Sequence, residues 1–192
     1  MTKLIMIRGC SGSGKTTLMK SFIQHHGMGL RDLNGIAFMQ SGGYIVLGDY
    51  TKDGCVGCDR YRNIADIKAH LALLRDAYAP DFLLFEHMLL STTYKYTKEL
   101  VAIFGKQNFG AIFLDNKFND ILRNISKRNA QKNIKQENVY KNFLRARNAF
   151  LKLAFSGVYT LRVDPFCYTP ASTYAIIDNF IASWNGVNSS GV

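Results

Sequence analysis

The residues with the clearest chemical meaning lie near the start of the chain. Gly9 to Thr16 read GCSGSGKT and match the pattern G-x-x-x-x-G-K-[ST] at every defined position. Small residues let such a loop wrap a phosphate, so that successive backbone N–H groups point at its oxygens. Lys15 adds a positive charge, and the Thr16 hydroxyl can hold Mg²⁺. The pattern predicts a phosphate-binding loop (P-loop) whose nucleotide-binding residues are Gly9, Ser11, Gly12, Ser13, Gly14, Lys15, Thr16 and Thr17.

The segments on either side of this loop supply the context that it needs. Residues 4–7 form a short apolar run suited to a buried strand. Residues 16–26 then predict a helix with one apolar face, and the dipole of that helix favours the same anion. A simple Gly/Ser turn between a strand and a helix is the alternative, and the complete motif favours nucleotide binding.

Carboxylates that could serve phosphoryl transfer follow in two places. Glu86 ends the apolar stretch 81–86, where it could hold Mg²⁺ through water or meet the acceptor hydroxyl; it could instead cap the next helix. Asp49 and Asp59 lie in the Gly-rich loop 48–62, and Asp59 is the better acceptor-side base. The sequence leaves open which of the three acts as the base.

Basic residues are concentrated late in the chain, whose formal net charge is +10. Residues 123–152 contain nine lysines and arginines against one acid, Glu137. A solvated helical face explains many such runs, but the surplus also suits a polynucleotide backbone. We expect Arg123 and Arg128, with Lys127, to stabilise the transferred phosphate. The expected nucleic-acid contacts are Arg60, Lys127, Lys132, Lys135, Lys141 and Arg145.

Apolar strands alternating with helical segments predict an α/β fold, a three-layer sandwich with helices on both faces of a mostly parallel five-stranded sheet. Ligands of such sheets lie beyond the carboxyl ends of the strands. We expect one P-loop domain over residues 1–184, with a basic helical lid at about 117–135 and a flexible tail at 185–192. The strands are expected near 4–7, 36–47, 81–86, 111–115 and 159–164, and the helices near 16–26, 64–77, 93–106, 119–130, 136–155 and 171–184.

Other features of the composition carry less information. The longest apolar runs are too short to span a membrane, which predicts a cytoplasmic protein without a membrane partner. Its four cysteines, Cys55 and Cys58 among them, are expected to be thiols, because no second ligand pair accompanies the lone C-x-x-C. The histidines, including His25 and His26, are expected to be incidental. The oligomeric state is not predicted.

The order of these motifs resembles that of P-loop nucleotide and nucleoside kinases, and in detail that of phage-type 5-hydroxymethyluracil DNA kinases. The resemblance rests on Gly57-Cys58-Asp59, on the segment Phe85 to Thr92, and on Arg123 to Asn129 followed by Gln136 to Val139. It implies phosphorylation of the hydroxymethyl group of a modified pyrimidine already inside DNA, a step in phage DNA hypermodification.

The same resemblance implies ATP, or another nucleoside triphosphate, as the phosphoryl donor, Mg²⁺ held by Thr16 and Glu86, and DNA as the partner. Catalysis would fall to Lys15, Asp59, Glu86, Arg123 and Arg128. A base extruded from the duplex could stack on Tyr44, Tyr50 or Tyr61. The alternatives are a kinase of free deoxynucleosides or mononucleotides, a polynucleotide 5′-hydroxyl kinase, and a P-loop switch that hydrolyses nucleotide without transfer.

Overall fold

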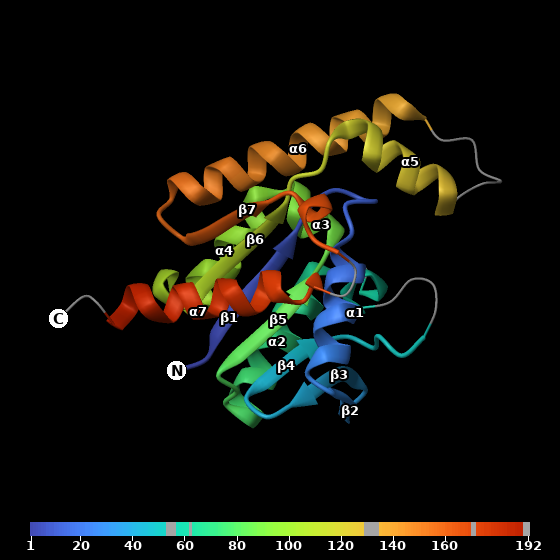
Figure 1. The fold of residues 1–192 in the computed structure, drawn as a ribbon. Coiled ribbons are helices and arrows are strands. Elements are labelled where there is room, and N and C mark those ends of the chain that lie inside the picture. The colour runs from blue at the N-terminus through green and yellow to red at the C-terminus, as the bar shows by residue number, and fades with distance from the viewer. Residues whose placement is uncertain (53–56, 62, 129–134, 170–171, 190–192) are drawn as a thin grey trace.

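Strand β1 (Lys3–Arg8) lies inside a seven-stranded sheet of order β2-β3-β4-β5-β1-β6-β7 (Figure 1). The computed structural model describes residues 1–52, 57–61, 63–128, 135–169 and 172–189. The other strands are β2 (Gly29–Leu33), β3 (Ile36–Ser41), β4 (Tyr44–Leu47), β5 (Phe82–Glu86), β6 (Phe109–Leu114) and β7 (Tyr159–Val163). The helices are α1 (Lys15–His25), α2 (Ile64–Tyr78), α3 (Met88–Thr92), α4 (Tyr94–Phe104), α5 (Phe118–Arg128), α6 (Gln136–Phe155) and α7 (Ala175–Ser189).

Five strands, β4-β5-β1-β6-β7, run parallel, so their carboxyl ends meet at one edge. The register sets Ile7 of β1 opposite Glu86 of β5, and Arg8 opposite Phe113 of β6. The P-loop leaves β1 at this same edge. The α/β class and the parallel character of the sheet are therefore as predicted.

The expected strand number of five is wrong, because an antiparallel hairpin extends the sheet. β2 pairs with β3, and β3 pairs with β4, both antiparallel. The β2–β3 turn is Asn34-Gly35, with positive φ at both residues, and this dipeptide is a strong hairpin signal. β2 was missed because this edge strand is mostly exposed and lacks alternating apolar residues.

Two layers of helices cover the sheet and enclose separate cores. On one face, α1 and α7 pack Phe22, Phe180 and Trp184 over the strands. On the other face, α2, α4 and α6 contribute Leu71, Leu100 and Leu153. A smaller cluster joins α5 and α6 to the end of β6. The predicted three-layer arrangement is thus present, and α5 and α6 extend beyond the carboxyl edge of the sheet (Figure 1).

The helices agree with the sequence prediction except at two places. A short helix, α3, precedes α4 and was not expected. α7 continues to Ser189, and Lys3 Nζ donates to Asn185 Oδ1 at 2.7 Å, so part of the expected tail is helical. The Asn63 side chain caps α2, because its Oδ1 accepts from Ala65 N at 2.9 Å. No helix in the described part of the chain has the length and apolar character of a membrane span.

The packing of α7 on β6 gives a stability prediction. A Cβ at Gly110 would lie 2.8 Å from both Phe180 Cζ and Trp184 Cζ3, so Gly110→Ala overpacks a rigid aromatic contact. We expect it to lower the free energy of unfolding by about 1–3 kcal/mol in urea denaturation. The control is Gly186→Ala in α7, where a Cβ meets nothing within 4 Å. Equal unfolding midpoints for the two variants would contradict this packing.

Candidate active site at the carboxyl edge of the sheet

The P-loop wraps around the ammonium group of its own lysine. Lys15 is 6% exposed, and its Nζ donates to Gly9 O at 3.1 Å and to Cys10 O at 3.0 Å. Gly14, at the N-cap of α1, has a φ of 93°, a conformation that side chains rarely adopt. The loop is thus pre-shaped, and an anion entering it would meet the buried cation and the start of α1.

Gly12 also has a close protein neighbour on the side of α5. A Cβ there would lie 2.8 Å from Ile125 Cγ1 and 3.0 Å from Ile121 O, both on α5. A side chain at Gly12 would therefore collide with α5. The small residue allows α5 to pack directly onto the loop.

Two polar side chains of α5 reinforce this contact. Asn124 Nδ2 donates to Gly12 O at 3.0 Å, and Arg128 Nη2 donates to Ser11 Oγ at 2.9 Å. A cavity of about 300 Å³ lies between them and the loop, lined by Ser11, Gly12, Gly14, Lys15, Thr16, Thr17, Met88, Asn124 and Arg128. Arg128 was predicted as a site residue from its charge. Asn124 and Met88 were not, because neither residue is charged or belongs to a binding motif.

The carboxylates Glu86 and Asp49 lie at the carboxyl ends of the strands on one side of β1. Glu86 is the last residue of β5, and Asp49 follows the end of β4. Glu86 is 1% exposed and accepts from the Tyr50 hydroxyl at 3.4 Å. Asp49 is also buried, and its Oδ1 accepts from Thr51 Oγ1 at 2.6 Å and Thr51 N at 3.0 Å. The Thr51 hydroxyl, then its backbone N–H, holds the pKa of Asp49 below its usual range. Asp49 therefore stays ionised near neutral pH.

The loop after β4 folds back tightly against the strand end. A Cβ at Gly48 would lie 2.5 Å from Gly57 Cα, and one at Gly57 would lie 2.5 Å from the Tyr50 hydroxyl oxygen. Cys58 is buried and its Sγ donates to Leu47 O at 3.4 Å. The predicted site residues Asp59 and Arg60 belong to this segment, but their side chains lie outside the described part, as does all of Cys55. Their roles stay predictions.

Of the tyrosines proposed for stacking, Tyr44 lies at the wrong end of the sheet. It begins β4, whereas the loop follows the end of that strand, and it packs against Phe22 and Phe82. Tyr50 is buried beside Glu86, and Tyr61 packs edge-on against His70. Stacking by Tyr44 at the P-loop edge is therefore excluded by its position.

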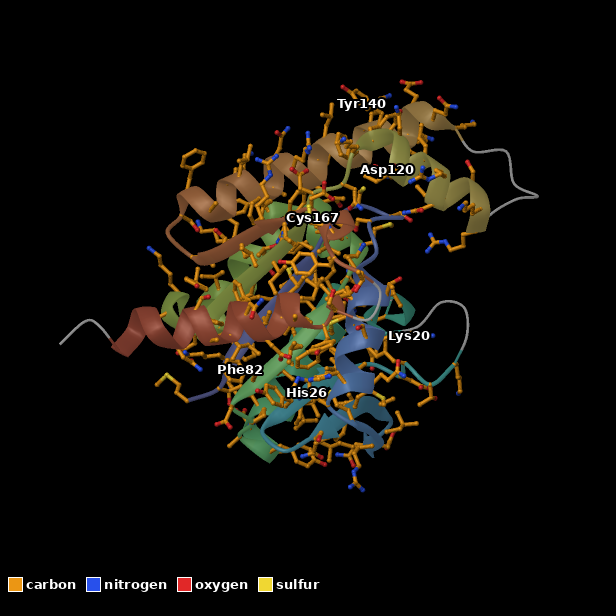
Figure 2. All side chains as sticks on the ribbon, viewed as in Figure 1. Lys20, His26, Phe82, Asp120, Tyr140 and Cys167 are labelled. Atoms are coloured by element: carbon orange, nitrogen blue, oxygen red, sulfur yellow. The ribbon has the colours of Figure 1, made fainter. Side chains whose placement is uncertain are left out.

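The described cations among the remaining predicted ones lie on α5, on α6 or at the N-cap of α6. These helices gather at one end of the molecule with Asp120 and Tyr140, away from Phe82 and His26 (Figure 2). Arg123 pairs with Asp120 at 2.8 Å, and Lys141 with Glu137 at 2.5 Å. Three others are exposed: Lys127, Lys135 and Arg145. Lys132 falls outside the described residues.

Asp115, which ends β6, is bound by two arginines. Its Oδ1 accepts from Arg147 Nε at 2.7 Å, and its Oδ2 accepts from Arg162 Nε at 2.5 Å. Arg147 also lies over the Phe143 ring, 4.5 Å from its centroid. This network ties α6 and β7 to the end of the strand beside the P-loop.

Arg8, immediately before the P-loop, is fully buried. Its guanidinium donates to Thr97 Oγ1 at 2.7 Å and to Ser91 O at 2.9 Å. Among the described residues it has no carboxylate partner, and desolvation lowers its pKa to about 9. These hydrogen bonds join α3 and α4 to the end of β1. No pattern in the sequence predicted them.

Comparison with curated proteins finds two significant relatives. The chain is 34% identical over 152 residues to the 5-hmdU DNA kinase of Pseudomonas phage M6, an alignment that covers 71% of this chain and 78% of that protein. It is 28% identical over 181 residues to the 5-hmdU DNA kinase of Delftia phage PhiW-14, covering 82% of this chain and 66% of the relative. No family model matches the chain.

Two solved structures of deoxyadenosine kinase from M. mycoides, one with bound dATP and one with bound dCTP, also align with the chain. The TM-scores are 0.47 and 0.49, both at 14% identity, and the alignments cover 93% and 94% of this chain and 99% of each solved chain.

The hydrogen bonds at Asp49 make a testable electrostatic prediction. Thr51→Val keeps the side-chain volume but removes the hydroxyl donor, so the pKa of Asp49 should rise toward its usual value. A ¹³C NMR pH titration of aspartate carboxyls measures this change, with Asp76, whose partner is Arg75, as the unaffected reference.

The change in the pKa of Asp49 also predicts how the stability difference between Thr51→Val and the wild type depends on pH. A depressed carboxyl pKa contributes stability above the unfolded-state pKa, and this contribution disappears as the pH falls through the folded-state pKa. The loss of stability in Thr51→Val should therefore be largest near neutral pH and shrink in acid. An unchanged Asp49 pKa would contradict the assigned hydrogen bond.

Proposed function

Because the chain belongs to the 5-hmdU DNA kinase family, we propose that it phosphorylates the 5-hydroxymethyl group of 5-hydroxymethyluracil in DNA, with ATP as donor. The observation that carries the proposal is the 34% identity to such a kinase over most of both chains, together with a pre-shaped P-loop. The hydroxymethyl oxygen would form a bond to the γ-phosphorus as the bond to the bridging oxygen of ADP breaks. The hydroxyl proton would pass to a carboxylate.

The donor half of the site is built by the P-loop and α5. Lys15 would exchange its bonds to Gly9 O and Cys10 O for phosphate oxygens. Arg128 lines the cavity and sits above Ser11, so it can reach the transferred group. Arg123 pairs with Asp120, and its guanidinium would have to leave that carboxylate before it could contact the transferred phosphate.

Mg²⁺ fits the same half of the site. Thr16 lines the cavity, and Glu86 is a buried carboxylate on the strand next to β1, so both offer oxygen ligands of the kind that the ion prefers. When bound, Mg²⁺ supplies charge neutralisation between the β- and γ-phosphates.

The strand order separates the roles of the two described carboxylates. β5, with Glu86, is adjacent to the P-loop strand, whereas β4, which leads to Asp49, lies one strand further out. Glu86 is therefore the better metal-side group and Asp49 the better acceptor of the hydroxyl proton. Asp49 is ionised at neutral pH and can accept a proton, but its lowered pKa makes it a weak base. Asp59 stays open as the alternative base.

DNA would approach along the outer cations of α5 and α6. Lys127, Lys135 and Arg145 are exposed, and positive charges of this kind bind phosphates without reading the sequence. A base inside a duplex must also leave the stack to reach the P-loop edge, which a grip on the flanking backbone would support.

The first test is phosphoryl transfer from γ-labelled ATP to DNA containing 5-hydroxymethyluracil. We expect internal label on that DNA, none on unmodified DNA, and a loss of about 100-fold or more in Lys15→Ala. Lys98→Ala is the control, because Lys98 is an exposed lysine of α4 that does not line the cavity at the P-loop. Label found on free nucleosides or only at DNA ends would select an alternative acceptor, and phosphate release without an acceptor would select the switch.

The second test is the salt dependence of DNA binding, measured by anisotropy of a labelled duplex. If Lys127 and Arg145 contact phosphates, replacing each by Gln should reduce the slope of log K against log[salt] by about 0.9. Lys98→Gln on α4 provides a control, since this exposed lysine lies outside the two basic helices. Identical slopes for all variants would place the DNA elsewhere on the protein.

A further inference from the structure

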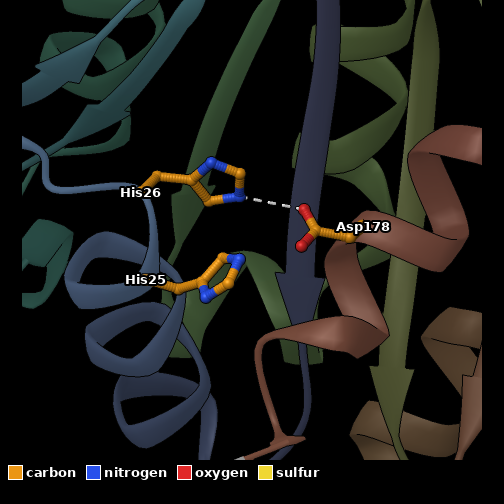
Figure 3. A group of neighbouring side chains, drawn as sticks. All are labelled: His25, His26 and Asp178. Carbon is orange, nitrogen blue, oxygen red and sulfur yellow. Dashed lines mark hydrogen bonds and ion pairs between the residues drawn. The ribbon is translucent and has the colours of Figure 1, made fainter.

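Three side chains that could bind a metal ion meet at the end of α1 opposite the P-loop. His25 closes α1, His26 follows it as the C-cap, and Asp178 lies in the first turn of α7 (Figure 3). One possible ligand atom from each residue lies within 4.8 Å of the others. Both histidines were expected to be incidental. Their partner Asp178 is more than 150 residues away in the chain, so the sequence does not show that the three residues meet.

The spacing is close to what a zinc ion requires. His26 Nε2 and Asp178 Oδ1 are 3.0 Å apart, and two ligands of a tetrahedral Zn²⁺ site with bonds of about 2.1 Å are about 3.4 Å apart. The ligand atoms lie up to 4.8 Å apart, so the widest separation must close by about 1.4 Å to reach tetrahedral spacing. His25 is exposed at the helix end, where a small rotation of its ring can supply this movement.

Aromatic contacts hold the imidazole ring of His26 in place, and one stacking contact orients the exposed ring of His25. His26 lies between Phe22 and Tyr44, with ring centroids 4.3 and 4.9 Å away. His25 stacks on Tyr174 at 3.6 Å with an interplanar angle of 9°. Rings that are fixed before binding lose less entropy when they become ligands.

The charge of Asp178 also favours a cation here. Its side chain is 31% exposed, and in the described part of the chain it pairs with His26 and with no lysine or arginine. A neutral imidazole leaves the carboxylate charge unbalanced, and a divalent ion would balance it while replacing the shared proton.

We propose that His25, His26 and Asp178 bind one Zn²⁺, with water in the remaining position. Two imidazoles and a carboxylate are a donor set that suits zinc. The site is about 16 Å from the P-loop along α1, so the ion takes no part in phosphoryl transfer. It joins the helix that begins at the P-loop to the C-terminal helix, and stabilises their contact on one face of the sheet.

The experiment uses the full chain without a polyhistidine tag, freed of metal by a chelator and titrated with Zn²⁺ in a calorimeter. We expect one ion per chain and a rise in Tm of at least about 4 °C when free zinc exceeds Kd by 100-fold. His25→Ala, His26→Gln and Asp178→Asn should each weaken binding at least tenfold. His70→Ala, which removes a histidine elsewhere, should bind as the wild type does.

The Tm of each variant in chelator shows whether it folds, and His25→Ala, at an exposed position, tests the site with least disturbance to the core. Loss of binding in the folded His25 and Asp178 variants supports the site. A wild-type chain that binds no zinc overturns the proposal. So does zinc binding that is unchanged in all three variants or lost equally in His70→Ala.

Discussion

The parallel pairing of β1 between β5 and β6 is the constraint on which the site depends. Residues 4–7 are fully buried, so a register slip of one residue would turn each side chain to the opposite face of the sheet. The register places Glu86 beside the strand that delivers the P-loop. The position of the carboxylate relative to the phosphate loop is therefore set by core packing several residues away from the site, and no residue of the site has to enforce it.

Charge is distributed along this edge in a way that suits an anion at the P-loop. Arg8 and Lys15 are buried at or near the end of β1, and Arg128 reaches the loop from α5. The neighbouring acid on the β6 side, Asp115, is neutralised by Arg147 and Arg162. On the other side, Glu86 accepts a hydrogen bond from the Tyr50 hydroxyl, and Lys52 Nζ lies 3.5 Å from Asp49 Oδ2. Cations and carboxylates thus flank the place where a γ-phosphate would lie.

Much of this architecture could be predicted, because local patterns determine it. The P-loop motif, the apolar strands and the helical periodicity predicted the parallel sheet and most helices. The β2–β3 hairpin was missed because an exposed edge strand carries no apolar alternation, although Asn34-Gly35 signalled its turn. Asn124, the Arg8 contacts and the meeting of His25 with Asp178 depend on tertiary proximity, which no spacing in the sequence reveals.

The count of basic residues in 123–152 overstates what is available to bind DNA. Arg147 holds Asp115, Arg123 pairs with Asp120, and Lys141 pairs with Glu137, so three of the nine already serve acids of the protein. Arg128 contacts the P-loop. The other cations in the described part of this segment, which we call the outer cations, are exposed: Lys127, Lys135, Arg145 and Lys152. Arg147 and Arg128 thus hold α6 and α5 near the P-loop, Arg123 and Lys141 pair with acids of their own helices, and a polyanion would meet the outer set. Because the two sets are separate, substitutions on the outer face can weaken DNA binding without disturbing the donor half of the site.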